Sequence, residues 1–193
     1  CKDKQLNISP YYFKPGFAYG GSCLPKDTKV LKMLANDVYV NVPVINNIES
    51  SNEIQKENAL NIIMNKGKKK IGILGLSFKP GTDDLRNSAI VDVVERLLGK
   101  GYEIRIYDKN VKLSQLTGTN KDFIEFKIPH LQQYITDNLM DVINSSEVIV
   151  ISNKEKEFEN IQKEFSNKSI IDLVRMWETI DFDCDYEGVS WGS

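Results

Sequence analysis

A short run of small, nucleophilic and charged residues, GGSCLPKD at positions 20–27, is the part of the sequence best suited to chemistry. Gly20 and Gly21 let the backbone approach a ligand closely or adopt a positive φ angle. Cys23 follows them, and a helix that we expect to begin near Asp27 would place its positive end close to the sulfur. That helix end and the neighbouring cation of Lys26 both favour the thiolate over the thiol. The run therefore predicts a nucleophilic cysteine, although a small buried cysteine in a tight turn is the commoner fate of such a residue.

The chemistry open to this cysteine depends on the bases around it. A cysteine hydrolase needs a general base, usually histidine, and the chain has one histidine, His130, in the sequence KIPH. His130 is far from Cys23 in sequence and stands where a short helix should begin, so we expect a structural or surface role for it. A cysteine that works without histidine fits aldehyde oxidation better. In that reaction the thiolate adds to an aldehyde, hydride leaves to a nicotinamide, and the thioester hydrolyses.

A second segment, KIGILGLSFKPGTDDLR at 70–86, has the pattern of a strand that ends in a glycine-containing loop before a helix. Ligands of open α/β sheets bind at the carboxyl ends of such strands, and Lys79 and Arg86 could both reach a phosphate. As a dinucleotide fingerprint the segment is poor, because its spacing is GxxG and its loop is long. Asp108, after the next expected strand, could mimic the ribose-binding acid of that motif. We favour a site for a different nucleotide, and an ordinary loop with glycines for packing stays open.

The elements that must position these residues begin with a loop and two helices. Residues 1–26 are rich in Pro, Gly, Tyr and Phe, which indicates an ordered loop. Residues 27–66 have helical spacing, with Asp27 as a plausible N-cap and a break at Pro43. The second helix, at about 44–66, has a polar middle that faces solvent, a polar cleft or a partner subunit.

From residue 68 onward, short apolar runs alternate with helical patterns, which predicts a parallel sheet covered on both faces. The expected strands are 70–74, 103–107, 147–151, 169–173 and a short one near Val189, and the expected helices are 88–100, 139–144 and 158–165. The predicted fold class is α/β, with a helical connecting region followed by a doubly wound, mainly parallel-sheet, Rossmann-like nucleotide-binding domain. We expect two parts, 1–66 with the cysteine loop and central helices, and 67–193 with the nucleotide-binding domain.

The composition argues against several classes of protein. A formal net charge of −2 over 193 residues offers no strongly basic surface for nucleic acid. No apolar stretch is long enough to cross a bilayer, and the start lacks the hydrophobic core of a secretion signal, so we expect no membrane partner and a cytoplasmic location. Three cysteines, an odd and sparse set, do not predict a network of disulfide bonds. No Cys/His cluster has the spacing of zinc ligands, so we expect no metal.

Both chemical segments resemble the UDP-glucose/GDP-mannose dehydrogenase family. GGSCLPKD at 20–27 is similar to its catalytic-cysteine motif, and GLSFKPGTDDLR at 75–86 is similar to the first loop of its nucleotide-binding domain. The resemblance covers essentially the whole chain, and NKDFIEFKIPHL at 120–131 brings it closest to the members that oxidise GDP-mannose. It implies oxidation of the C6 hydroxyl of a nucleotide-diphosphate sugar to a carboxylate with NAD, with GDP-mannose as the preferred substrate and UDP-glucose as the alternative.

The resemblance also implies roles for individual residues. Cys23 would add to the C6 aldehyde and carry the thioester, Asp27 would assist proton handling, and Lys26 and Arg86 would contact the cofactor. The nucleotide sugar would be bound by Asn7, Tyr11, Tyr12, Lys14, Phe17, Tyr19, Gly20, Phe78 and Lys79. Lys14 departs from the arginine expected in the GDP-mannose enzymes and lacks its bidentate fork for phosphate.

Two further expectations come from the family. Its members carry an amino-terminal Rossmann domain with GxGxxG, and no GxGxxG occurs in this chain. We therefore expect the chain to be a substrate-binding half that does not turn over alone, and to form a homodimer through its central helices. A non-catalytic module that binds nucleotide sugars is the alternative.

Overall fold

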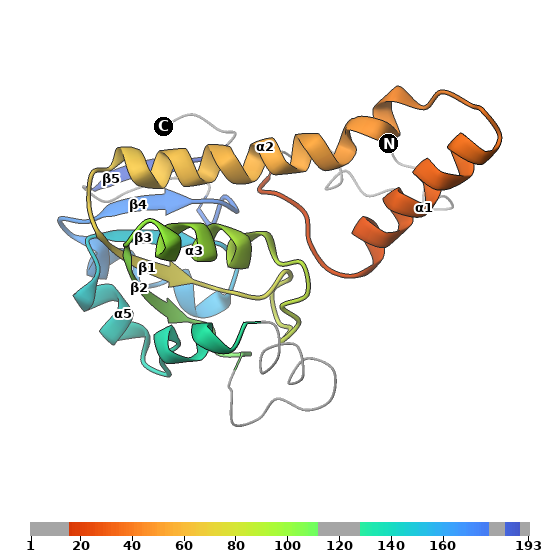
Figure 1. Cartoon of the computed structure of the whole chain (residues 1–193). Coiled ribbons are helices and arrows are strands. Elements are labelled where there is room, and N and C mark those ends of the chain that lie inside the picture. Colours follow the sequence, from red (N-terminus) through yellow and green to blue (C-terminus); the bar gives the residue numbers. More distant parts are fainter. Residues whose placement is uncertain (1–15, 112–127, 178–183, 190–193) are drawn as a thin grey trace, which may run out of the picture.

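The computed structural model describes residues 16–111, 128–177 and 184–189. Two long helices come first, α1 (Cys23–Asp37) and α2 (Pro43–Asn65). The rest forms an α/β domain of strands and shorter helices: β1 (Lys70–Leu74), α3 (Ala89–Gly99), β2 (Glu103–Tyr107), η2 (Pro129–Tyr134), α5 (Leu139–Ser145), β3 (Val148–Ile151), η3 (Lys156–Phe158), η4 (Gln162–Phe165), β4 (Ser169–Asp172) and β5 (Asp185–Gly188). Figure 1 shows this order, with the long α2 leading from α1 to the sheet.

Helix α1 begins earlier in the chain than the sequence suggested, with its N-cap five residues before the predicted one. Its N-cap is Ser22, so the predicted cap, Asp27, lies inside the helix and the prediction of its start was wrong. Pro25 does not delay the start, because the first turn of a helix has no use for the backbone N–H that proline lacks. Helix α2 begins with Pro43 at its first position and gives way to Gly67, which has a φ of 65°.

Five parallel strands form one sheet in the order β2-β1-β3-β4-β5. The chain runs from β1 to one edge and then returns to place β3 on the other side of β1, which is the doubly wound arrangement. The α/β fold class is confirmed, and the expected strands 70–74 and 103–107 agree at both ends. The expected helix at 158–165 was wrong, because two 3₁₀ turns carry its two aromatic anchors, Phe158 and Phe165, which are both fully buried.

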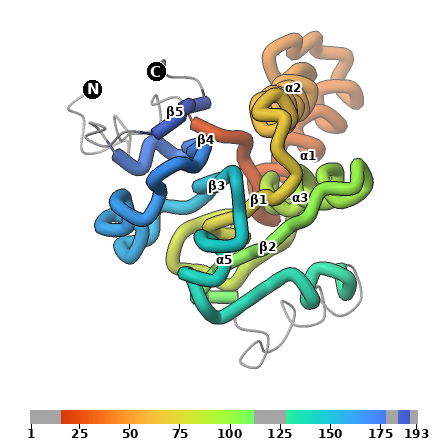
Figure 2. Tube along the Cα trace, turned by 90° about the vertical axis from the view of Figure 1, so that its left-hand side faces the viewer, coloured from red at the N-terminus to blue at the C-terminus, as the bar shows by residue number. Residues whose placement is uncertain are grey.

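The sheet is buried on both faces, and alternate residues of each strand point to opposite sides. On β1, Ile71 and Ile73 join the core that packs against α2 and α3, whereas Leu74 joins the core that packs against α5 and the 3₁₀ turns. Figure 2 shows the sheet between these layers. Burial of nearly continuous apolar strands fixes their carboxyl ends in one row, and ligands of such sheets bind at that edge.

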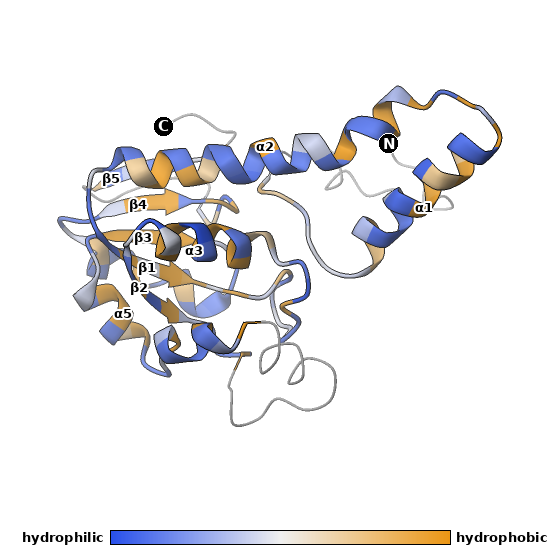
Figure 3. Ribbon diagram, viewed as in Figure 1, coloured by the Kyte–Doolittle hydropathy of each residue, from blue (hydrophilic) through white to orange (hydrophobic). Residues whose placement is uncertain are grey.

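Helix α2 belongs to two environments. Its carboxyl-terminal half buries Ala59, Leu60 and Ile63 against the sheet domain, while its amino-terminal half extends beyond that domain beside α1 (Figure 1). Large apolar side chains are exposed on α1 and at its junction with α2, among them Val30, Leu31, Met33, Leu34, Val38, Tyr39, Val40 and Val44. Figure 3 shows orange, hydrophobic stretches on α1, outside the sheet domain.

Candidate functional site

Cys23 is exposed and is the first residue of α1. Its sulfur lies 3.9 Å from the hydroxyl oxygen of Ser22. The unpaired N–H groups of the first helical turn give this end of α1 a partial positive charge. The sequence placed the helix end near the sulfur, and the structure brings it closer by starting the helix at the cysteine itself.

The cysteine loop, residues 16–22, packs directly on the loop that follows β1. The backbone N–H of Gly21 donates to the carbonyl of Arg86 at 3.0 Å, and the side-chain amide of Asn87 donates to the carbonyl of Gly21 at 2.9 Å. A Cβ at Gly20 would lie 2.4 Å from the Asn87 carbonyl oxygen, and Gly21 has a φ of +83°. Two glycines are therefore required for this close approach, as their position before the cysteine indicated.

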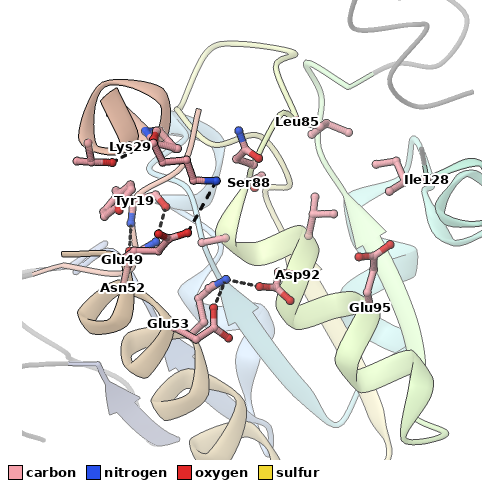
Figure 4. Close-up of a pocket in the computed structure, with 16 residues that line it drawn as sticks. Tyr19, Lys29, Glu49, Asn52, Glu53, Leu85, Ser88, Asp92, Glu95 and Ile128 are labelled. Carbon is pink, nitrogen blue, oxygen red and sulfur yellow. Dashed lines mark hydrogen bonds and ion pairs between the residues drawn. The ribbon is translucent and has the colours of Figure 1, made fainter. Parts of the chain in front are cut away.

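Asn52 of α2 binds the same loop from a different side. Its Oδ1 accepts a hydrogen bond from the Tyr19 backbone N–H at 2.8 Å, and its Nδ2 donates to the Tyr19 carbonyl at 3.1 Å. Figure 4 shows both bonds. Part of the polar middle of α2 thus faces the cysteine loop.

A cavity of about 340 Å³ opens between the cysteine loop and the carboxyl ends of β1, β3 and β4. The loop contributes Gly16, Phe17, Ala18 and Gly20, and the strand ends and α3 contribute Ser77, Phe78, Pro80, Ser88, Ala89, Ile90, Ser152, Asn153, Lys154, Leu173 and Val174. The cavity lies beside the point where the strand order reverses between β1 and β3. That is where open α/β sheets bind their ligands.

Three of the residues expected to bind substrate, Phe17, Gly20 and Phe78, line this cavity together. Tyr19 instead lines a neighbouring cavity between the helices. Lys79 lies on the exposed loop after β1, where its carbonyl accepts hydrogen bonds from Ser77 and Thr82. Four other expected substrate residues lie outside the described residues: Asn7, Tyr11, Tyr12 and Lys14.

The expected cofactor and proton-handling residues lie on either side of the loop contact. Lys26 and Asp27 form an exposed ion pair of 3.5 Å on α1. Arg86 is held by Asp84, whose two carboxylate oxygens accept from its Nε at 2.8 Å and from its terminal nitrogen at 2.6 Å. These bonds lower the pKa of Asp84 and raise the pKa of Arg86, and Cys23 adds to the latter as a nearby negative charge when ionised. The Arg86 guanidinium is therefore within electrostatic reach of the sulfur.

Asp108 is not available for a ribose. One of its carboxylate oxygens accepts from the backbone N–H groups of Leu76 and Ser77 at 2.7 and 3.0 Å, and the other accepts from those of Asn110 and Val111 at 2.9 and 3.3 Å. The side chain is committed to shaping two loops, so the idea that it mimics a ribose-binding acid was wrong.

Several cavity residues were missed by the sequence analysis. Ser152, Asn153 and Lys154 follow β3 directly, and the Asn153 amide donates to the carbonyl and hydroxyl of Ser77 at 3.1 and 2.9 Å. The signal was present, because polar residues at the end of a buried strand that adjoins the switch point line the binding edge. The Nε2 atom of His130, by contrast, lies 3.3 Å from a carboxylate oxygen of Glu95 on α3, and both side chains are exposed.

A second cavity, of about 320 Å³, lies between α1, α2 and α3 and is drawn in Figure 4. Beside it, Glu53 and Lys56 of α2 form an ion network with Asp92 and Arg96 of α3. The hydrogen bond from Lys56 is the main cause of the lowered pKa of Glu53. Burial would raise the pKa of Asp92, but its bonds to Lys56 and Arg96 outweigh that effect and lower it. The network fixes α2 to α3 near the cysteine loop.

Within residues 16–111, 128–177 and 184–189, no group of three or more His, Cys, Asp or Glu side chains gathers in a way that could hold a metal ion. In the same residues, no helix has the length and apolar character needed to cross a membrane.

Two family models match the chain. The UDP-binding domain of the UDP-glucose/GDP-mannose dehydrogenase family matches residues 72–179, over half of the chain. The central domain of the same family matches residues 1–54, which include Cys23. The two matched regions meet, in the structure, at the contact between the cysteine loop and the loop after β1.

The GDP-mannose 6-dehydrogenase of Pseudomonas putida is 45% identical over 193 residues, 99% of this chain and 44% of that protein. The UDP-glucose 6-dehydrogenase of Streptococcus pneumoniae is 32% identical over 172 residues, 88% of this chain and 39% of that protein. A crystal structure of a ternary complex of GDP-mannose dehydrogenase from Pseudomonas aeruginosa matches with a TM-score of 0.90 and 42% identity, over 99% of this chain and 44% of that one. The chain thus spans less than half the length of these relatives. Its sequence and its fold together make it a member of the UDP-glucose/GDP-mannose dehydrogenase family.

Proposed function

We propose that this chain is the substrate-binding half of an NAD-dependent nucleotide-sugar 6-dehydrogenase. Its nucleotide-diphosphate sugar would occupy the cavity at the ends of β1, β3 and β4, and Cys23 would carry the oxidised sugar carbon as a thioester. The observation that carries the proposal is the exposed Cys23 at the start of α1, directly after a loop that lines that cavity. Residues 1–66 would supply the cysteine and residues 67–193 the nucleotide site.

The chemistry assigned to the chain concerns the second oxidation. The Cys23 thiolate adds to the C6 aldehyde to form a thiohemiacetal, loss of hydride from that carbon gives the thioester, and water releases the carboxylate and the thiol. The sulfur attacks as the thiolate, which is the nucleophilic form of cysteine. Asp27, four residues along α1, would assist the proton transfers, and Lys26 and Arg86 would lie beside the cofactor.

NAD supplies the oxidant in this scheme, by accepting hydride. The described residues do not fit a complete dinucleotide site, because the loop after β1 has no GxGxxG and Asp108 is spent on four backbone N–H groups. We therefore propose that the dinucleotide is bound mainly by a domain outside these 193 residues, which would explain why the relatives are more than twice as long.

GDP-mannose is the proposed substrate. The GDP-mannose 6-dehydrogenase of Pseudomonas putida matches 99% of the chain at 45% identity, whereas the UDP-glucose 6-dehydrogenase of Streptococcus pneumoniae matches 88% of it at 32%. UDP-glucose remains the second candidate, because one family model describes a UDP-binding domain over residues 72–179.

A second copy of the chain is the proposed protein partner. The exposed apolar side chains of α1 and of its junction with α2 lie outside the sheet domain. Contiguous exposed apolar surface on a helix marks an interaction site. Association of two copies through these helices would cover it.

The test joins the chain to the amino-terminal part of a Pseudomonas relative and measures NADH formation with GDP-mannose. We expect about two NADH per sugar for the native cysteine. Cys23→Ser should stop net formation of the carboxylate, whereas Cys184→Ser, a matched change at the other described cysteine, should leave it intact. Complete two-step oxidation by the Cys23→Ser protein would show that the cysteine has another role.

Titration of the 193-residue chain with GDP, UDP and NAD⁺ ranks the nucleotides. A preference for GDP supports the substrate assignment, and a preference for UDP favours the second candidate. A preference for NAD⁺ would instead support the hypothesis of a dinucleotide site on the loop after β1. A non-catalytic binding module, the alternative, predicts nucleotide binding together with no turnover in the joined protein.

A further inference from the structure

The cysteine loop is attached to α2 by a single side chain that uses both of its hydrogen-bonding groups. Asn52 accepts from the backbone N–H of Tyr19 at 2.8 Å and donates to the Tyr19 carbonyl at 3.1 Å, across 33 residues of sequence. Both residues are partly buried, and Figure 4 shows them beside the cavity between the helices. Asn52 therefore pairs with both backbone hydrogen-bonding groups of Tyr19, as a neighbouring β-strand would.

An amide is the group that this geometry requires. The side chain of asparagine presents a donor and an acceptor in one plane, matched to the acceptor and donor of a peptide. An ionised carboxylate at the same position keeps an acceptor for the N–H but faces the Tyr19 carbonyl with a second oxygen. A protonated carboxyl group, in contrast, has both a donor and an acceptor and restores the match.

The helix that carries Asn52 is itself fixed at the next turn. Lys56 lies 2.5 Å from Glu53 and also pairs with Asp92 of α3, and Arg96 binds Asp92 at 2.8 Å and also pairs with Glu53. The ion network holds α2 against the sheet domain. The side chain of Asn52 therefore has a fixed position, and its hydrogen bonds fix the cysteine loop relative to the sheet domain.

We propose that Asn52 is a positioning residue for Cys23. By fixing the Tyr19 backbone, it sets the path of the chain into α1 and hence the place of the sulfur relative to the strand-end cavity. This inference rests on the proposed function, in which the sulfur must meet the sugar carbon. Asn52 acts through the loop and touches no substrate. A displacement of about 1 Å in such an arrangement is enough to cost roughly 100-fold in rate.

The test uses the joined enzyme described above, with Asn52→Ala and Asn52→Asp. Asn58→Asp is the matched control, because Asn58 is exposed on the same helix. We expect Asn52→Ala to lower kcat about 10- to 100-fold, with a smaller rise in KM for the nucleotide sugar and a melting temperature within about 3 °C of wild type.

Asn52→Asp separates positioning from simple loss of structure. Its kcat, expressed as a ratio to wild type at each pH, should rise as the pH falls and the introduced carboxyl group protonates, while the ratio for Asn58→Asp stays flat. An unchanged kcat in Asn52→Ala, or a ratio for Asn52→Asp that does not recover at low pH, would overturn the proposal. Failure of the wild-type enzyme to oxidise any nucleotide sugar would instead refute the proposed function.

Discussion

The backbone N–H of Gly21 donates to the backbone carbonyl of Arg86 at 3.0 Å, which joins the cysteine loop to the loop after β1 two residues before the sulfur. The contact between the two loops leaves no room for a side chain at position 20, because a Cβ there would lie 2.4 Å from the carbonyl oxygen of Asn87. We expect Gly20→Ala to force the loops apart, with a loss of about 1–3 kcal/mol in the free energy of unfolding and weaker GDP binding. Urea denaturation and titration measure both. Gly99→Ala, at the end of α3, where a Cβ would meet no atom within 4 Å beyond its chain neighbours and its own helix, should weaken neither.

The Arg86 guanidinium should speed reactions of Cys23. Arg86→Gln removes a cation that lies within electrostatic reach of the sulfur, so alkylation of Cys23 by iodoacetamide should slow about 2- to 5-fold at neutral pH. The difference should shrink at high salt, since salt screens exposed charges. Peptide mass spectrometry separates Cys23 from the other cysteines. Equal alkylation rates at low salt would remove Arg86 from the electrostatic environment of the sulfur.

The ion network between α2 and α3 predicts a dependence of stability on pH. The pKa values of Glu53 and Asp92 are lowered in the folded protein. Their contribution to the free energy of unfolding is therefore complete above their unfolded pKa values, about 4. It is lost as the pH falls through the lower pKa values of the folded protein. Burial opposes the charge of Lys56, but its bonds to Asp92 and Glu53 outweigh burial and raise its pKa. Its contribution is therefore lost as the pH rises through that folded value.

Asp92→Asn should lower the melting temperature at pH 7 by about 2–4 °C, the equivalent of about 1 kcal/mol for a chain of this size. The difference from wild type should narrow as the pH falls below about 4, the unfolded value, toward the lowered pKa at which the native carboxylate protonates. Glu49→Gln, which removes the surface pairs of Glu49 with Lys29 and Lys32, is the control and should have little effect. A difference that stays constant across the pH range would contradict an electrostatic origin.

Asp108 should be a residue of stability and not of ligand recognition. Asp108→Asn keeps the size of the side chain but replaces an acceptor of two backbone N–H groups with a donor. Because Asp108 is only 5% exposed, we expect a loss of about 2–4 kcal/mol. The midpoint of urea unfolding measures it. An unchanged midpoint together with weaker nucleotide binding would return Asp108 to a ribose-binding role.

Lys154 should contribute to nucleotide binding, since it lines the strand-end cavity. Lys154→Met should weaken GDP binding to the 193-residue chain by about 5- to 20-fold at low salt, as expected for one lost charge-assisted phosphate contact. Lys156→Met is the control, because Lys156 is also exposed and lies just beyond, at the start of η3. Calorimetric titration with GDP compares the variants, and equal losses for the two lysines would indicate only a general effect of net charge.

The sequence was sufficient for most of the fold and for part of the site. The apolar runs at 70–74 and 103–107 predicted β1 and β2 to the residue, because a strand buried on both faces is apolar throughout. The start of α1 was misplaced, because Asp27, a residue type that often caps helices, was taken as the N-cap, whereas Ser22 holds that position. Segment 158–165 has helical spacing between its aromatic residues, but burial of those two anchors does not require a continuous helix.

The rest of the site depends on contacts between distant parts of the chain. Nothing in the residues around Asn52 shows that its amide meets Tyr19, because that contact exists only once α2 has packed on the sheet domain. The same holds for Asp108, whose partners Leu76 and Ser77 are more than thirty residues away. Local pattern identifies elements and motifs, while the use of a polar side chain is decided by tertiary packing.

The continuity of α2 restricts how its sequence can change in length. One unbroken helix of 23 residues, about 35 Å long, presents Asn52 to the cysteine loop and Ala59 and Ile63 to the sheet. Each added or deleted residue between them would turn one set of contacts by about 100° relative to the other. A single-residue insertion between Asn52 and Ala59 would therefore misalign the contacts to the cysteine loop with the contacts to the sheet.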